Sequence, residues 1–233
     1  MDFIDLKTQQ KRIRDGLKVR FDRILDHGAY IMGPEVTELE EKLAEYCGVK
    51  HAISCSSGTD ALLIPLMAWN IGPGDAVFTT PFTYVATAEV ISLLGATPVF
   101  VDVYESTFNI DCEKLELAIQ NTISEGKLTP KAIIPVDLFG LPARYRLIEE
   151  IAKKYDLKVI EDAAQSFGAS IRDQKVGNFG DVAATSFYPA KPLGCYGDGG
   201  AIFTDNDELA KKCKAIRIHG TTTDRYHSEL IGL

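Results

Sequence analysis

Three short polar clusters contain residue types that can do chemistry. The first, at residues 56–61, reads Ser-Ser-Gly-Thr-Asp-Ala between an apolar run and a helical pattern. Hydroxyls and free backbone N–H groups at the start of a helix can bind a phosphate. Ser and Asp are also common N-cap residues, so an ordinary helix cap is the alternative interpretation of this cluster taken alone.

The second cluster, Glu-Asp-Ala-Ala-Gln-Ser at residues 161–166, follows the apolar run Val159–Ile160. A carboxylate at the carboxyl end of a parallel strand points into the crevice where ligands bind in such sheets. There it could keep a ring nitrogen protonated and make the ring an electron sink. A helix cap is again possible, but two carboxylates and an amide after a strand favour a functional role.

The third cluster, at residues 186–194, reads Ser-Phe-Tyr-Pro-Ala-Lys-Pro-Leu-Gly and precedes a run rich in glycine. Desolvation in such an apolar stretch lowers the pKa of a lysine and frees its amine to attack a carbonyl. A single lysine is most often a solvated surface charge. Lys191 becomes a candidate nucleophile because of the other two clusters.

The elements that must position these clusters alternate between strand and helix patterns. We expect strands at 51–55, 76–79, 97–101, 132–136, 158–161, 182–187 and 200–204, and helices at 9–25, 35–46, 58–69, 83–94, 112–121 and 144–155. Such alternation with apolar strands predicts an α/β fold with a mostly parallel central sheet and helices on both faces. No linker interrupts residues 50–210, which we treat as one unit.

Composition excludes several classes of protein. The net charge of −8, without a basic run, argues against a general nucleic-acid binder. Five widely spaced cysteines without a CxxC pair indicate buried free thiols rather than a metal site. No leader pattern and no apolar stretch approaching about 20 residues is found, so we expect a cytoplasmic protein without a membrane segment.

Four motifs in order then carry a family resemblance. Gly-Thr-Asp-Ala-Leu from residue 58, Phe-Thr-Tyr-Val-Ala-Thr-Ala from residue 82, and the second and third clusters resemble the DegT/DnrJ/EryC1/StrS sugar aminotransferases. The resemblance covers essentially the whole chain. It implies a fold type I transferase that uses pyridoxal 5'-phosphate, with an N-terminal helical segment and substrate-side turn at 1–50 and the cofactor-binding large domain at 51–233. Family members continue into a small C-terminal domain, which we expect to be missing here.

The resemblance also implies roles for individual residues. Lys191 would form the Schiff base with the cofactor and then move the proton between the substrate carbon and the cofactor carbon. Asp162 would pair with the pyridine nitrogen, Gln165 would hydrogen-bond the phenolic oxygen, and Tyr84 would stack on the ring, or Phe82 if the register is off by two. The phosphate would lie against Ser57, Gly58, Thr59 and Ser186.

The resemblance further implies a reaction and a substrate class. Related dehydratases have histidine in place of the lysine, so Lys191 favours transamination from glutamate to a nucleotide-linked keto sugar. The stretches 4–10, 27–33 and 191–200 most resemble the branch that aminates UDP-linked 3-keto-N-acetylglucosaminuronic acid for O-antigen synthesis. In that branch Gly28 and Tyr30 would contact substrate; a turn that only links two helices is the alternative.

The resemblance implies a homodimer in which each active site is shared between subunits. Two other interpretations of the cofactor site stay open: a truncated, inactive relative that only binds cofactor or dimerises, and a dehydratase that uses the same cofactor. A generic nucleotide-binding α/β protein is a further alternative. The absence of a GxGxxG motif after the first strand and of a P-loop weakens it.

Overall fold

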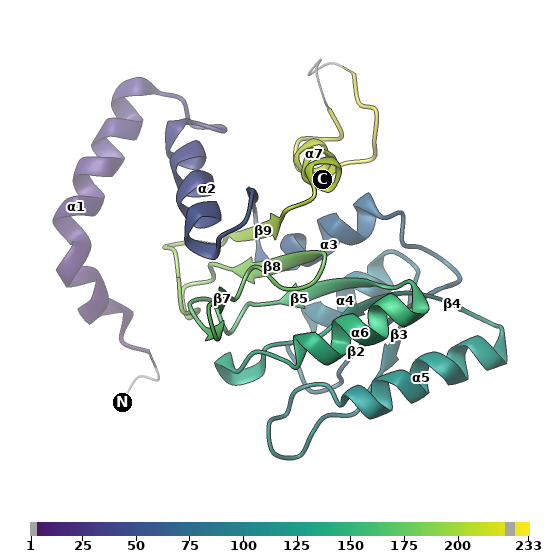
Figure 1. Cartoon of the computed structure of the whole chain (residues 1–233). Coiled ribbons are helices and arrows are strands. Elements are labelled where there is room, and N and C mark those ends of the chain that lie inside the picture. The colour runs from purple at the N-terminus through teal and green to yellow at the C-terminus, as the bar shows by residue number, and fades with distance from the viewer. Residues whose placement is uncertain (1–3, 222–226) are drawn as a thin grey trace.

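The computed structural model describes residues 4–221 and 227–233 and is built around a seven-stranded sheet (Figure 1). The strands lie in the order β1-β9-β8-β5-β4-β2-β3. Their bounds, in that order, are His51–Cys55, Gly200–Thr204, Val182–Ser186, Lys158–Asp162, Thr129–Ile134, Asp75–Thr79 and Thr97–Phe100.

In the seven-stranded sheet of the described residues, only β9 runs against the direction of the other strands. The pairs β2–β3, β2–β4, β4–β5 and β5–β8 are parallel, whereas β9 pairs antiparallel with both β8 and β1. The predicted mostly parallel sheet is therefore confirmed. β8 and β9 are neighbours, and the segment that joins them holds Lys191.

Helices cover both faces of the sheet, as predicted. One face packs against α3 (Gly58–Ala68), α4 (Ala86–Leu93) and α7 (Asp207–Ile216), and the other packs against α5 (Cys112–Glu125) and α6 (Tyr145–Tyr155). Side chains alternate across a strand, so neighbouring residues of β2 pack into different helix layers. Val77 packs with α3, α4 and α7, and Phe78 packs with α5 and α6. A third apolar cluster joins α2 (Pro34–Cys47) to β1, β8 and β9.

The N-terminal helix α1 (Leu6–His27) lies to one side of the sheet (Figure 1). It begins at Asp5, whose carboxylate accepts from the Thr8 N–H group, and ends at Gly28 in the left-handed conformation. None of its residues is buried, and Phe21 is 61% exposed. The helix predicted at 9–25 is confirmed, but no described part of this chain buries its apolar side chains.

Several boundaries differ from the prediction for local reasons. The helix expected at 83–94 begins only at Ala86, because residues 80–85 form a turn in which the Thr80 hydroxyl accepts from the Phe82 N–H group. α5 continues to Glu125, where Gly126 adopts a left-handed conformation that ends the helix. α7, the short helix η1 (Leu138–Gly140) and the hairpin β6–β7 (Ser170–Ile171 and Gln174–Lys175) were not predicted.

The cysteine prediction is partly wrong. All five are free thiols; Cys47, Cys112 and Cys213 are buried as expected, whereas Cys55 and Cys195 are half-buried. Within residues 4–221 and 227–233, no three or more His, Cys, Asp or Glu side chains gather in a way that could hold a metal ion. None of the helices in these ranges is long and apolar enough to cross a membrane.

Candidate active site

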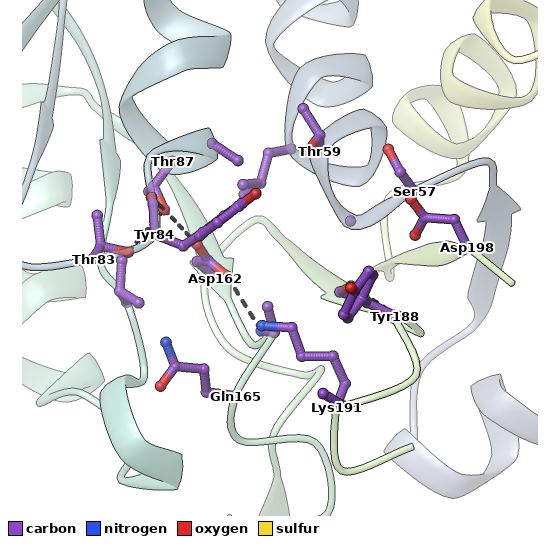
Figure 2. Close-up of a pocket in the computed structure, with 17 residues that line it drawn as sticks. Ser57, Thr59, Thr83, Tyr84, Thr87, Asp162, Gln165, Tyr188, Lys191 and Asp198 are labelled. Atoms are coloured by element: carbon purple, nitrogen blue, oxygen red, sulfur yellow. Dashed lines mark hydrogen bonds between the residues drawn. The ribbon is translucent and has the colours of Figure 1, made fainter. Parts of the chain in front are cut away.

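A cavity of about 480 Å³ opens where the carboxyl ends of β5 and β8 meet the start of α3 (Figure 2). Such crevices are where open α/β sheets bind ligands, and this volume lies in the range typical of small-molecule sites. The cavity brings together eight of the ten predicted site residues: Ser57, Gly58, Thr59, Tyr84, Asp162, Gln165, Ser186 and Lys191.

Asp162 ends β5 and is only 4% exposed. Its Oδ2 accepts a hydrogen bond of 2.9 Å from the Thr87 hydroxyl, and its Oδ1 accepts one of 3.2 Å from the Ala164 N–H group. Burial raises the pKa of Asp162, while these two bonds and the charge of Lys191 oppose the rise. A cationic partner placed beside this carboxylate would favour its ionised form.

Lys191 reaches into the cavity from the loop between β8 and β9, and its side chain extends toward Asp162 (Figure 2). The backbone N–H group of Lys191 donates to the carbonyl of Tyr188 at 2.8 Å, which shapes the turn that carries the side chain. Lys191 is half-buried. An amine and a carboxylate thus face the same space from two different segments of the chain.

The start of α3 forms a polar cradle on another side of the cavity. Ser57 caps the helix by accepting from the Asp60 N–H group at 3.0 Å. A Cβ atom added at Gly58 would lie 2.5 Å from the Cβ of Ser186, so only glycine lets the helix approach β8 this closely. Because the first N–H groups of a helix have no intrahelical partner, this cradle suits a phosphate.

Gln165 presents a donor to the cavity. Its Oε1 accepts a hydrogen bond of 2.9 Å from the Phe139 N–H group, so the amide nitrogen is the atom left for a ligand. Of the two aromatic candidates, Tyr84 lines the cavity and lies over Asp162 in Figure 2. Phe82 does not line the cavity. Its ring packs against that of Phe108, with the two ring centroids 5.3 Å apart.

Gly28 and Tyr30 are not brought to this cavity by the described chain. Gly28 caps α1, with its N–H group donating to the carbonyl of Ile24 at 3.0 Å. Tyr30 follows in the turn before α2 and is 63% exposed. The linking of two helices accounts for Gly28 in this chain. Among the described residues, the exposed Tyr30 ring makes no side-chain hydrogen bond or ring contact.

Sequence reasoning missed four polar lining residues: Thr83, Thr87, Tyr188 and Asp198. Thr87 matters most, because its hydroxyl bonds Asp162, and the Thr83 hydroxyl lies 3.0 Å from that of Thr87. Thr83 and Thr87 belong to the motif at residues 82–88, and their spacing of four residues was the available signal. Only the strand order reveals that they lie beside Asp162.

Known proteins of similar sequence and structure identify the family of this chain. The chain is 54% identical, over its whole length, to the UDP-2-acetamido-2-deoxy-3-oxo-D-glucuronate aminotransferase of Pseudomonas aeruginosa, and it spans 63% of that protein's length. A crystal structure of a DegT DnrJ EryC1 StrS aminotransferase from Brucella abortus superposes with a TM-score of 0.98 at 55% identity, covering 100% of this chain and 62% of the other. A Bacillus subtilis protein solved with the cofactor PMP bound superposes with a TM-score of 0.84 at 34% identity, covering 96% and 49%.

The fold is therefore that of the type I transferases, as the resemblance implied. The sequence pattern of the DegT/DnrJ/EryC1/StrS aminotransferase family matches residues 11–233. The matched range includes the cluster that opens α3, the end of β5 and the lysine loop, all of which line one cavity. The chain belongs to the DegT/DnrJ/EryC1/StrS aminotransferase family.

Proposed function

We propose that this chain binds pyridoxal 5'-phosphate in the cavity and carries out transamination from glutamate to a nucleotide-linked keto sugar. The observation that carries the proposal is the placement of Lys191 and Asp162 across one cavity whose third side is the cradle at Ser57, Gly58 and Ser186. The residues present fit the cofactor, because an amine, a buried carboxylate and a helix start match its aldehyde, ring nitrogen and phosphate.

When bound, pyridoxal phosphate supplies a conjugated ring that takes up the electron pair left when a carbon loses its proton. The residues of this chain do the remaining work. Lys191 would hold the cofactor through its Nζ atom and would move the proton between carbon atoms during the reaction. Asp162, bonded to Thr87, would in its ionised form keep the ring nitrogen protonated. The roles of these residues are part of the proposal.

The other lining residues orient the ring. The N–H group of Phe139 donates to Oε1 of Gln165, so the Gln165 amide N–H would point toward the phenolic oxygen. Tyr84 covers one ring face and excludes water from it. The cradle at Ser57, Gly58, Thr59 and Ser186 would hold the phosphate. Together these residues would hold the cofactor at its ring and at its phosphate, in the cavity that Lys191 also lines.

We propose a UDP-linked 3-keto-N-acetylglucosaminuronic acid as the amino acceptor, within O-antigen synthesis. The name and 54% identity of the Pseudomonas aeruginosa relative support this choice. Gly28 and Tyr30 are proposed to contact that substrate. Because these two residues lie away from the cavity within this chain, their role requires that a second copy bring the α1–α2 turn to the site.

A homodimer with shared active sites is therefore part of the proposal. The exposed apolar stripe of α1, which includes Ile13, Phe21 and Leu25, supports it, since such a stripe needs a covering partner. We further propose a cytoplasmic location and a division into residues 1–50, a helical segment on the substrate side, and residues 51–233, the cofactor-binding domain. Sedimentation at several protein concentrations tests the dimer.

A reduction experiment tests the cofactor proposal directly. Borohydride treatment of protein loaded with pyridoxal phosphate is expected to attach the cofactor to the peptide that contains Lys191, as read by mass spectrometry. Lys191→Ala should lose the attachment and the transfer of nitrogen from labelled glutamate to the keto sugar. Lys175→Ala, which changes a lysine outside the cavity, is the matched control and should keep both. Protein that never binds the cofactor, or Lys191→Ala protein that still transfers nitrogen, refutes the proposal.

A further inference from the structure

Glu161 lies next to Asp162 in β5, but its side chain points to the opposite face of the strand and is completely buried. Its Oε2 accepts hydrogen bonds from the N–H groups of Gly177 at 3.0 Å and Phe179 at 3.1 Å. Within the described part of the chain, no donor reaches its Oε1. A buried carboxylate oxygen without a donor is costly, so this atom needs an explanation.

Asp137, which follows β4, is a second fully buried carboxyl group on this side of the sheet. Phe179, whose N–H group donates to Glu161, stacks on Tyr145, whose hydroxyl donates to Asp137, and the charge of Asp137 acts on Glu161. Asp137 already accepts three hydrogen bonds, from the Ala143 N–H group at 2.9 Å, the Tyr145 hydroxyl at 2.7 Å and the Ser166 hydroxyl at 2.8 Å. Two carboxyl groups can bond each other only if one of them carries a proton.

The surroundings decide which carboxyl group carries that proton. Three donors stabilise the ionised form of Asp137, whereas Glu161 receives donors on one oxygen only. Burial raises the pKa of Glu161 well above its ordinary value, and the nearby charge of Asp137 raises it further. Other ionisable groups near the pair are Tyr145 of α6, Cys47 of α2 and Asp162 of β5 itself, none of which is a cation. The Lys175 ammonium of β7 also acts on Cys47, but it lies 3.6 Å from the centroid of the Tyr46 ring and, among the described residues, makes no ion pair with Glu161 or Asp137.

The pair also joins the segments that carry the two proposed ring contacts. The Asp137 N–H group donates to the carbonyl of Asp162 at 3.1 Å, and the Ser166 hydroxyl that bonds Asp137 follows Gln165 in the chain. On its other side, Glu161 holds the loop at Gly177, where an added Cβ would lie 2.7 Å from the sulfur of Cys47 in α2. A displaced Glu161 would therefore disturb both Asp162 and the turn that carries Gln165.

We propose that Glu161 is a positioning residue that keeps its proton at neutral pH and donates it to Asp137, so that the buried pair carries one negative charge and holds Asp162 and Gln165 in place. The part that concerns Asp162 and Gln165 as ring contacts rests on the proposed function. The shared proton is a property of the protein without cofactor. The two parts can therefore fail separately.

Infrared spectroscopy of the cofactor-free protein tests the shared proton. At neutral pH the wild-type protein should show the carbonyl stretching band of a protonated carboxylic acid, and Glu161→Gln should remove it. An amide at this position can still accept from Gly177 and Phe179 and donate to Asp137, so the variant is expected to fold. Glu116→Gln, which changes a carboxylate on the outer surface of α5, should leave the band unchanged. If the spectrum of wild type minus that of Glu161→Gln lacks this band, the proposal is overturned.

Stability against pH gives a second readout. Glutamate in an unfolded chain has a pKa of about 4.3. Because the folded-state pKa of Glu161 is raised, its contribution to stability is fully present below that value and is lost as pH rises toward the folded-state pKa. Denaturant midpoints of Glu161→Gln should therefore rise relative to wild type between about pH 4 and pH 8. A difference between the two proteins that stays constant over this range overturns the proposal.

Cofactor affinity tests the positioning role. Glu161→Leu removes both the acceptor for the loop and the donor to Asp137, and should weaken pyridoxal phosphate binding at least about tenfold. Glu161→Gln should restore most of that loss. Equal affinity of the leucine variant and wild type, or a glutamine variant as weak as leucine, overturns the positioning role. If wild-type protein binds no cofactor, the proposed function fails, while the infrared and pH results still decide whether the proton is shared.

Discussion

The hydroxyl of Thr87 donates a hydrogen bond of 2.9 Å to Oδ2 of Asp162, and both side chains are buried. The Thr87 oxygen lies 3.0 Å from that of Thr83, so the single Thr87 proton can go to Asp162 while Thr83 supplies a donor to Thr87. This chain of hydroxyls stabilises the ionised form of a carboxylate that burial would otherwise neutralise. It links the turn before α4 to the end of β5.

Replacing Thr87 by valine should weaken cofactor binding. The variant keeps the shape of the side chain but removes the donor to Asp162, which raises the pKa of that carboxyl further. A hydrogen bond to a charged group is worth about 1.5–3 kcal/mol, so affinity at neutral pH should fall about tenfold or more. Fluorescence titration with pyridoxal phosphate measures the effect. Thr87→Ser, which keeps the hydroxyl, should bind within a few-fold of wild type; equal losses in both variants would contradict the role of the bond.

Gly58→Ala should damage the cradle at the start of α3. The added Cβ would lie 2.5 Å from that of Ser186, and either the helix or β8 must move. We expect a loss of about 1–3 kcal/mol in the free energy of unfolding, together with weaker cofactor binding. Urea denaturation measures the first quantity. Gly16→Ala is the control: it adds a Cβ in open space within α1 and should leave stability equal or slightly higher. If Gly58→Ala proves as stable as Gly16→Ala, the structure relieves the close contact without losing free energy of unfolding, and the prediction is contradicted.

Cofactor affinity should fall as pH is lowered. Burial raises the pKa of Asp162 above its ordinary value of about 3.9, and a protonated ring nitrogen needs that carboxyl in its ionised form. Without cofactor, the contribution of Asp162 to stability is present at low pH and is lost as pH rises through the raised pKa. Cofactor binding reverses this pH dependence, because the complex favours the ionised form of Asp162. The dissociation constant of the wild-type protein should rise as pH is lowered from pH 8 to pH 5. Asp162→Asn should bind the cofactor weakly at every pH and should lack the part of this pH dependence that comes from protonation of Asp162.

Tyr145→Phe should destabilise the fold without changing the cavity lining. The Tyr145 ring is 1% exposed and stacks on Phe179 with centroids 4.6 Å apart, and this stack survives the change. The lost hydroxyl leaves Asp137 with one donor fewer, which should cost about 1–3 kcal/mol. Urea denaturation is again the measurement. Tyr155→Phe, which removes a hydroxyl that bonds the partly exposed Glu116, should cost less than about 1 kcal/mol. A reversed order of the two losses would contradict the importance of the buried pair.

Much of the architecture could be predicted because its signals are local. Apolar runs of four to six residues marked each of the seven strands of the sheet, and the glycines at 28 and 126 end helices through a left-handed conformation that is easiest for glycine. The two-residue strands at 170–171 and 174–175 were missed because they are too short to show a period. The start of α4 was misplaced by three residues because a turn at 80–85 precedes it.

By itself, the sequence determined which residues could do chemistry and the order of elements that carry them. The cluster that opens α3, the end of β5 and the lysine loop could each be found locally, because caps, strand ends and turns depend on neighbouring residues. Only the tertiary structure decided that the Thr87 hydroxyl donates to Asp162 and that Glu161, one residue earlier, turns to the opposite face, where it accepts from Gly177 and Phe179. The physical reason is the sheet: strand order brings distant segments together, and the alternation of side chains sends adjacent carboxylates to opposite faces.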